Sequence, residues 1–286
     1  MKNLVVFAVA AVMGTACIVA IAGCNSSTSA EADVQEPARA VTDETQSPEP
    51  QKAGGGMAAM QKAAHAKKYL FALFRKEEGP QTSAMRAVLE EVMEEVADKA
   101  DSVEVNVTAS SERAIVDKFG LDRAPMPIIL AIAPNGAVTG GFPTEVEKQK
   151  LLDAFASPGT EKCMKQLQDN KLVFLCVQSG DTKSNDEALK GVREFKADTR
   201  FAQATEIVML DPTDTAEAGF LKDLQIDPKT ETAVTVFLAP PGMPVAIYEG
   251  ATNKDELVAT LQKASSACGP GGCGPGGCSP GACPPQ

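Results

Sequence analysis

Four cysteines near the C-terminal end of the sequence have the types and the spacing to do chemistry. They stand at every fifth position, at Cys268, Cys273, Cys278 and Cys283. Each gap contains a Pro-Gly pair, which suits the centre of a type II turn and would bring the flanking thiols toward one another. Four thiolates can bind a soft cation such as Cu(I) or Zn(II). The same thiols can instead form disulfides or crosslinks, or exchange with the thiols of a partner, and the sequence leaves these three roles open.

Another cysteine follows an apolar run at the start of the sequence. Lys2 precedes an uncharged, mostly apolar run over residues 4–22, which ends in Ile-Ala-Gly before Cys24. The arrangement resembles the bacterial lipobox, which implies a signal peptide over residues 1–23 and a covalent lipid such as palmitate on Cys24. An uncleaved helical anchor is the alternative, because the run is nearly long enough to span a bilayer. Both alternatives predict a bacterial cell-envelope protein that is held at a membrane and faces the periplasm or the exterior.

Two further cysteines fall in the central part of the sequence. Cys176 lies within an apolar run that is typical of a buried strand, which favours an inert core residue. Cys163 precedes it, on a predicted helix or linker. A structural disulfide between Cys163 and Cys176 is compatible with an oxidising compartment, but one sequence does not fix the pairing.

The composition excludes several classes of function. The sequence has one histidine, His65, which leaves no room for a multi-histidine metal site. The formal net charge of −11 argues against nucleic acid as a partner, because a basic surface supplies most of the affinity for it. The sequence contains no phosphate-binding loop, no HExxH sequence and no nucleophile elbow. These observations favour a protein that is not an enzyme and has no certain cofactor.

The two ends of the mature chain have the composition of flexible segments. Residues 24–64 are rich in small and polar residues, and their acidic side chains outnumber the basic ones. Such a segment buries too little apolar surface to offset the entropy cost of ordering it. We therefore expect a flexible acidic tether behind Cys24. Residues 265–286 form the tail that is rich in Cys, Gly and Pro.

The middle of the sequence consists of two similar units, at residues 65–157 and 158–264. The apolar run at 69–74 matches the run at 172–177 as a buried strand. In each unit a later apolar run ends in a Pro-x-Gly turn, which predicts a hairpin. Each unit is expected to run strand, helix, strand, helix, strand, strand, helix. This order predicts an α/β fold with two tandem domains, each a mixed central sheet flanked by helices.

The helix between the first two strands is the most clearly marked element. Apolar residues recur at helical spacing from Met85 to Val96 and predict a core-facing stripe. The other face is predicted to be solvated, and its glutamates are Glu90, Glu91, Glu94 and Glu95.

This order of elements resembles the thioredoxin fold, and the first unit carries local matches to that family. The loop after its first strand aligns with the Cys-Gly-Pro-Cys loop of thioredoxins, and its residues are Glu78, Gly79, Pro80 and Gln81. The Gly-Pro pair matches, whereas a Glu and a Gln replace the two cysteines. Further along, Met126-Pro127 matches the family's cis-proline, so the resemblance implies a cis bond before Pro127. The second unit resembles the family more weakly, because Ala233 stands at the cis-proline position.

The resemblance implies a groove beside Pro127, bordered by the loop of residues 78–81, that can hold an extended peptide. Dithiol exchange needs an attacking thiolate and a resolving thiol in this loop, and the first unit has neither. We therefore predict a non-catalytic binding or scaffold module that presents the cysteine-rich tail and binds other envelope proteins. The alternative is a thiol–disulfide oxidoreductase or redox-homeostasis protein that uses the four C-terminal cysteines.

Overall fold

The computed structural model describes residues 54–267. The predicted signal peptide, Cys24 and the four C-terminal cysteines lie outside the described residues. The described residues belong to one compact unit. Within residues 54–267, none of the helices combines the length and the apolar content that a bilayer crossing requires. We refer to residues 54–157 as the first half and to residues 158–267 as the second half.

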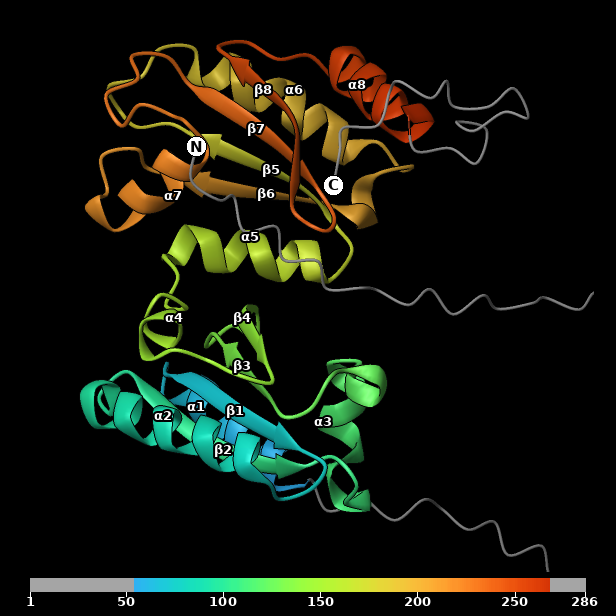
Figure 1. The fold of residues 1–286 in the computed structure, drawn as a ribbon. Coiled ribbons are helices and arrows are strands. Elements are labelled where there is room, and N and C mark those ends of the chain that lie inside the picture. Colours follow the sequence, from blue (N-terminus) through green and yellow to red (C-terminus); the bar gives the residue numbers. More distant parts are fainter. Residues whose placement is uncertain (1–53, 268–286) are drawn as a thin grey trace, which may run out of the picture. The chain divides into compact units, whose positions relative to one another are not determined.

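The first half contains four strands in the order β2-β1-β3-β4, with helices on both faces (Figure 1). Its strands are β1 (Tyr69–Arg75), β2 (Ala100–Asn106), β3 (Ile128–Ile132) and β4 (Val138–Pro143). Its α-helices are α1 (Gly55–His65), α2 (Pro80–Val96), α3 (Arg113–Lys118) and α4 (Lys148–Leu152). β1 runs parallel to β2 and antiparallel to β3, and β3 and β4 form the predicted hairpin.

Both faces of this sheet are buried, which explains why β1 is apolar along most of its length. On one face, α1 and α3 cover side chains such as Leu70 and Phe74. On the other face, α2 and α4 cover side chains such as Phe71 and Leu73. Because successive strand residues point to opposite faces, a strand that is covered on both sides must be apolar at every position. The first charged residue of β1 is its last one, Arg75.

The predicted apolar stripe of α2 is confirmed. Pro80 occupies the first turn of the helix, where a missing N–H breaks no helical hydrogen bond. The apolar side chains that α2 buries in the core recur at helical spacing and are Met85, Leu89, Val92 and Val96. The four predicted solvent-facing glutamates of α2 are exposed.

The second half repeats this order. Its strands are β5 (Leu172–Val177), β6 (Thr205–Leu210), β7 (Val234–Ala239) and β8 (Met243–Glu249), in the order β6-β5-β7-β8. Its α-helices are α5 (Pro158–Gln168), α6 (Asn185–Ala197), α7 (Ala218–Asp223) and α8 (Lys254–Ala267). β5 is parallel to β6 and antiparallel to β7, and β7 and β8 form the second predicted hairpin. Two four-stranded mixed sheets with helices are therefore confirmed.

A glutamate caps the first helix of each half, which the sequence did not predict. The N–H of Gly56 in α1 donates to Glu112 Oε2 at 3.0 Å, and the N–H of Gly159 in α5 donates to Glu217 Oε1 at 2.7 Å. Helix N-termini leave N–H groups without partners and favour negative charge, so both carboxylates stabilise the helix start. A Cβ on Gly159 would lie 2.7 Å from Glu217 Oε2, so this close approach requires glycine. Both halves therefore cap their first helix in the same way.

The predicted tether is wrong at its C-terminal end. It was expected to run to residue 64, but α1 begins at Gly55. Ala63 is buried, and Met57 and Met60 pack against the same apolar cluster. These three residues are three apart, which places them on one helix face. The folded part of the first half therefore begins at Gly55, ahead of the predicted boundary at residue 65.

Candidate functional site

The loop that stands in place of the redox loop joins β1 to α2. Gly79 has an extended backbone and precedes the helix. The Thr82 hydroxyl donates to the Glu77 carbonyl at 3.2 Å, which holds the loop against the first turn of α2. Of the four predicted site residues of this loop, Gly79 is half-buried. The other three are exposed, and they are Glu78, Pro80 and Gln81.

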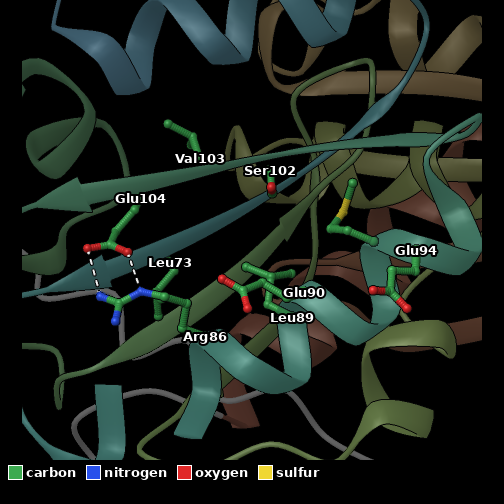
Figure 2. Close-up of a pocket in the computed structure, with 9 residues that line it drawn as sticks. Leu73, Arg86, Leu89, Glu90, Glu94, Ser102, Val103 and Glu104 are labelled. Carbon is green, nitrogen blue, oxygen red and sulfur yellow. Dashed lines mark hydrogen bonds and ion pairs between the residues drawn. The ribbon is translucent and has the colours of Figure 1, made fainter. Parts of the chain in front are cut away.

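Four charged side chains fasten this loop to the sheet. Glu78 pairs with Arg75 Nε and with Arg86 Nη2, each at 3.0 Å. Glu104 of β2 pairs with the same two arginines, and Figure 2 shows its contacts with Arg86. Hydrogen bonds from Arg86 and then Arg75 hold the pKa of Glu104 below its ordinary value, although partial burial opposes them. Glu104 and Glu78 in turn raise the pKa of Arg86. The four groups form a charge-balanced cluster that ties the loop to β2.

Three residues of this cluster were not predicted as site residues, and they are Arg75, Arg86 and Glu104. They come from β1, α2 and β2, and no local pattern links them. The parallel pairing of β1 with β2 places Leu73 opposite Glu104. A predicted register of the two strands would have been the only signal that brings Glu104 close to the end of β1.

The predicted cis bond is confirmed at Met126-Pro127. Pro127 is buried and directly precedes β3, whose first residue, Ile128, lies opposite Phe74 of β1. The proline therefore comes to the same end of the sheet as the loop of residues 78–81. The Pro127 carbonyl accepts a hydrogen bond from Thr144 N–H at 2.7 Å. Among residues 54–267, the backbone N–H and C=O of Met126 have no hydrogen-bond partner.

The second half closes the equivalent position with its own chain. Ala233 occupies the place of the proline, and its carbonyl accepts from Gly250 N–H at 2.8 Å, as Pro127 accepts from its own partner. Lys183 forms a parallel bridge with Thr232, the equivalent of Met126. Its N–H donates to the Glu231 carbonyl at 2.8 Å, and its carbonyl accepts from Ala233 N–H at 2.9 Å. Lys183 thus pairs with the two residues that flank Thr232. The backbone of Thr232 itself meets Thr230 Oγ1, to which its N–H donates at 3.4 Å and from which its carbonyl accepts at 2.8 Å, whereas the equivalent groups of Met126 have no partner among residues 54–267.

The two described cysteines are free thiols, so the disulfide considered between Cys163 and Cys176 is not formed. Cys163 belongs to the cluster beneath α5 and α7, whereas Cys176 belongs to the cluster beneath α6 and α8. The two thiols therefore lie on opposite faces of one sheet. Burial raises the pKa of Cys163 to about 12 and that of Cys176 to about 11, which makes both poor nucleophiles. Cys176 is thus buried as predicted.

No cluster of three or more His, Cys, Asp or Glu in residues 54–267 is arranged to hold a metal ion. The soft-metal site considered for Cys268, Cys273, Cys278 and Cys283 lies outside the described residues.

Several solved structures align with the chain. The germline-specific thioredoxin Deadhead of Drosophila melanogaster is 14% identical, and the alignment covers 36% of this chain and 93% of that one, with a TM-score of 0.29. Thioredoxin O2 of Arabidopsis thaliana is 14% identical over 34% of this chain and 81% of that one, with a TM-score of 0.29. A chloroplastic thioredoxin z is 18% identical over 36% of this chain and 88% of that one, with a TM-score of 0.27. No family model and no curated protein matches the chain.

Proposed function

We propose that the protein is a lipid-anchored cell-envelope protein with two tandem thioredoxin-like domains, and that its first domain binds extended segments of other envelope proteins without catalysing thiol exchange. The observation that carries this proposal is the unpaired backbone of Met126 beside Pro127. An unpaired backbone N–H and C=O next to a sheet is a template for an added strand.

The second half supports this role by contrast. The Thr230 hydroxyl pairs there with both backbone groups of Thr232, which correspond to the open groups of Met126. We infer that the first half leaves the position open for a partner, while the second half fills it to complete its own fold.

The chemistry of the loop supports binding over catalysis. Thioredoxin-type exchange needs a thiolate here, and residues 78–81 contain none. The Arg75, Arg86, Glu78 and Glu104 cluster fixes the loop without supplying a nucleophile. A fixed loop loses little entropy when a segment docks beside it, which favours recognition.

Two experiments test this proposal. The chain ended at Ala267 should reduce insulin no faster than buffer with dithiothreitol alone, and a substantial rate would overturn the non-catalytic assignment. Peptides selected from a displayed library against the full-length protein should shift the NMR amide signal of Met126 and leave that of Thr232 unchanged. Binding that is insensitive to Pro127→Ala and to charge reversal at Glu77 and Glu78 would also overturn the assignment.

Thiol chemistry of the tail is a second candidate function, favoured by one observation. The thiols of Cys163 and Cys176 are buried with raised pKa values, so thiol reactivity in the mature chain falls to the C-terminal cysteines. These could bind Cu(I) or Zn(II), form disulfides or crosslinks, or serve an oxidoreductase. Mass spectrometry of protein purified from its own envelope separates these roles. A loss of four hydrogens without bound metal would remove the metal site, and four free thiols with a bound ion would establish it.

A further inference from the structure

A long hollow runs beside the outer edge of β2. A part of about 450 Å³ lies between α2 and β2 (Figure 2). A part of about 280 Å³ continues it toward the start of β2, and the two share Met93 and Ser102. Together they follow the strand from Glu104 back to Ala100. We call these two hollows the edge groove.

Two polar residues explain why this side of β2 is hollow. Ser102 pairs with Phe71 in the first half, and Ile207 occupies the same register position opposite Phe174 in the second. Ile207 packs against the apolar cluster beneath α6, but a serine side chain is too short to fill that space. The next residue on the same face is Glu104 in the first half, where the second half has Met209.

The backbone of β2 is open along this groove. Within residues 54–267, β2 pairs with β1 alone and forms an edge of its sheet. Tyr69 N–H donates to the Lys99 carbonyl, and Val107 N–H donates to the Arg75 carbonyl, both at 2.9 Å. Since backbone groups alternate in direction along a strand, the odd-numbered residues of β2 face β1. The N–H and C=O groups of residues 102 and 104 therefore point to the open edge.

The side chains around the groove define the chemistry that fits it. Its floor is apolar and includes Leu73, Leu89 and Met93. Its rim carries Glu90 and Glu94, which are one helical turn apart, exposed, and without a cationic partner among residues 54–267. The neighbouring pair on the same helix, Glu91 and Glu95, binds Lys148 instead.

We propose that the edge groove is a docking site for a basic, extended segment of a partner protein, which pairs with β2 as an additional strand. Its apolar side chains rest on Leu89 and Met93, and its Lys or Arg side chains reach Glu90 and Glu94. Edge strands that leave their backbone unpaired bind added strands, and alternate side chains then give specificity. The rim also carries Lys62, which lines the smaller hollow, and the pair Glu90 and Glu94 borders only the larger one. The site is separate from the Met126 position and does not depend on its role.

A charge-matched pair of variants tests the side-chain part of this proposal. The probe is a fluorescent peptide that alternates Thr with Leu and Lys, measured by anisotropy on the full-length protein at low salt. A peptide with Glu in place of Lys is expected to bind at least tenfold more weakly. Glu90→Gln with Glu94→Gln should raise the Kd about fivefold. Glu91→Gln with Glu95→Gln changes the charge equally on the same helix and should leave the Kd within about twofold. Equal losses for both pairs would overturn the proposal.

The backbone part is tested in two ways. Ser102→Pro removes an N–H that faces outward and spares the pairing with β1, so the Kd should rise about tenfold while circular dichroism stays unchanged. A probe peptide methylated on alternate backbone nitrogens should lose binding to the unaltered protein by a similar factor. Full binding of the methylated peptides in both registers would exclude strand addition. A dimer in sedimentation that Ser102→Pro abolishes would assign the edge to self-association and overturn the proposal.

Discussion

The two halves share their strand order and their helix-capping glutamate, yet they differ at the same two places on the sheet. Just before the third strand, the backbone of Met126 has no partner among residues 54–267, whereas the backbone of Thr232 meets the Thr230 hydroxyl. Along the edge strand, Ser102 lines a hollow, whereas Ile207 at the same register position packs against the apolar cluster beneath α6. The second half thus completes its own surfaces, whereas the first half leaves two of them open. Small local replacements on the same strand order thus give the two halves different surfaces.

The largest expected difference concerns the capping glutamates. Glu217 is 5% exposed and accepts from both Gly159 N–H and the Ser157 hydroxyl, so Glu217→Ala leaves the buried Gly159 N–H without a partner. We expect it to cost about 3 kcal/mol of unfolding free energy. Glu112 is only half-buried, so Glu112→Ala should cost about 1 kcal/mol. Urea denaturation measures both changes in unfolding free energy. Equal losses for the two variants would show that burial does not determine how much each cap stabilises the protein.

Exchanging the residue types at the matching edge-strand positions, Ser102 and Ile207, should reduce the difference in packing between the two halves. Ile207→Ser removes apolar packing against the α6 cluster and should destabilise the protein by about 2 kcal/mol. Ser102→Ile adds an apolar side chain over the edge groove and should raise stability by up to about 1 kcal/mol. Calorimetric melting of the two variants compares them. A destabilising Ser102→Ile would mean that the groove is not the counterpart of the filled space in the second half.

The smallest expected effect is the pH dependence of the charged cluster. The folded-state pKa of Glu104 lies below its ordinary 4.5, so its ion pairs stabilise the fold above pH 4.5. This contribution is lost as the pH falls through the lowered folded-state pKa. Glu104→Gln should therefore cost about 0.5 kcal/mol at pH 7, because the pairs are partly exposed. The difference between the two proteins should shrink in acid, and a difference that grows there would contradict the assigned ion pairs.

Much of the fold could be predicted from the sequence, since periodicity and turn residues are local signals. The stripe from Met85 to Val96 predicted α2, and the Pro-x-Gly turns predicted both hairpins. The family resemblance predicted the cis bond at Pro127. α1 was not predicted, because three glycines stand at its start and a segment of small and polar residues precedes it. This composition is typical of a flexible segment, and the apolar stripe of α1 is too short to indicate a helix against it.

The candidate site was less predictable, because its decisive features depend on long-range register and on the backbone. Arg86 and Glu104 form their ion pair only because α2 packs beside β2. Their spacing in the sequence does not predict this contact. The bridge of Lys183 to Thr232 uses main-chain groups, which every residue except proline supplies, so no side-chain pattern could reveal it.

Amide hydrogen exchange tests the central claim most directly, because it compares the open position with the closed one in a single protein. In the free full-length protein, the Met126 amide should exchange rapidly, and the Thr232 amide, which donates to the Thr230 hydroxyl, should exchange about tenfold more slowly. Adding a selected binding peptide should protect Met126 and leave the second half unchanged. Protection of Met126 in the free protein, or none when the peptide is bound, would contradict the account.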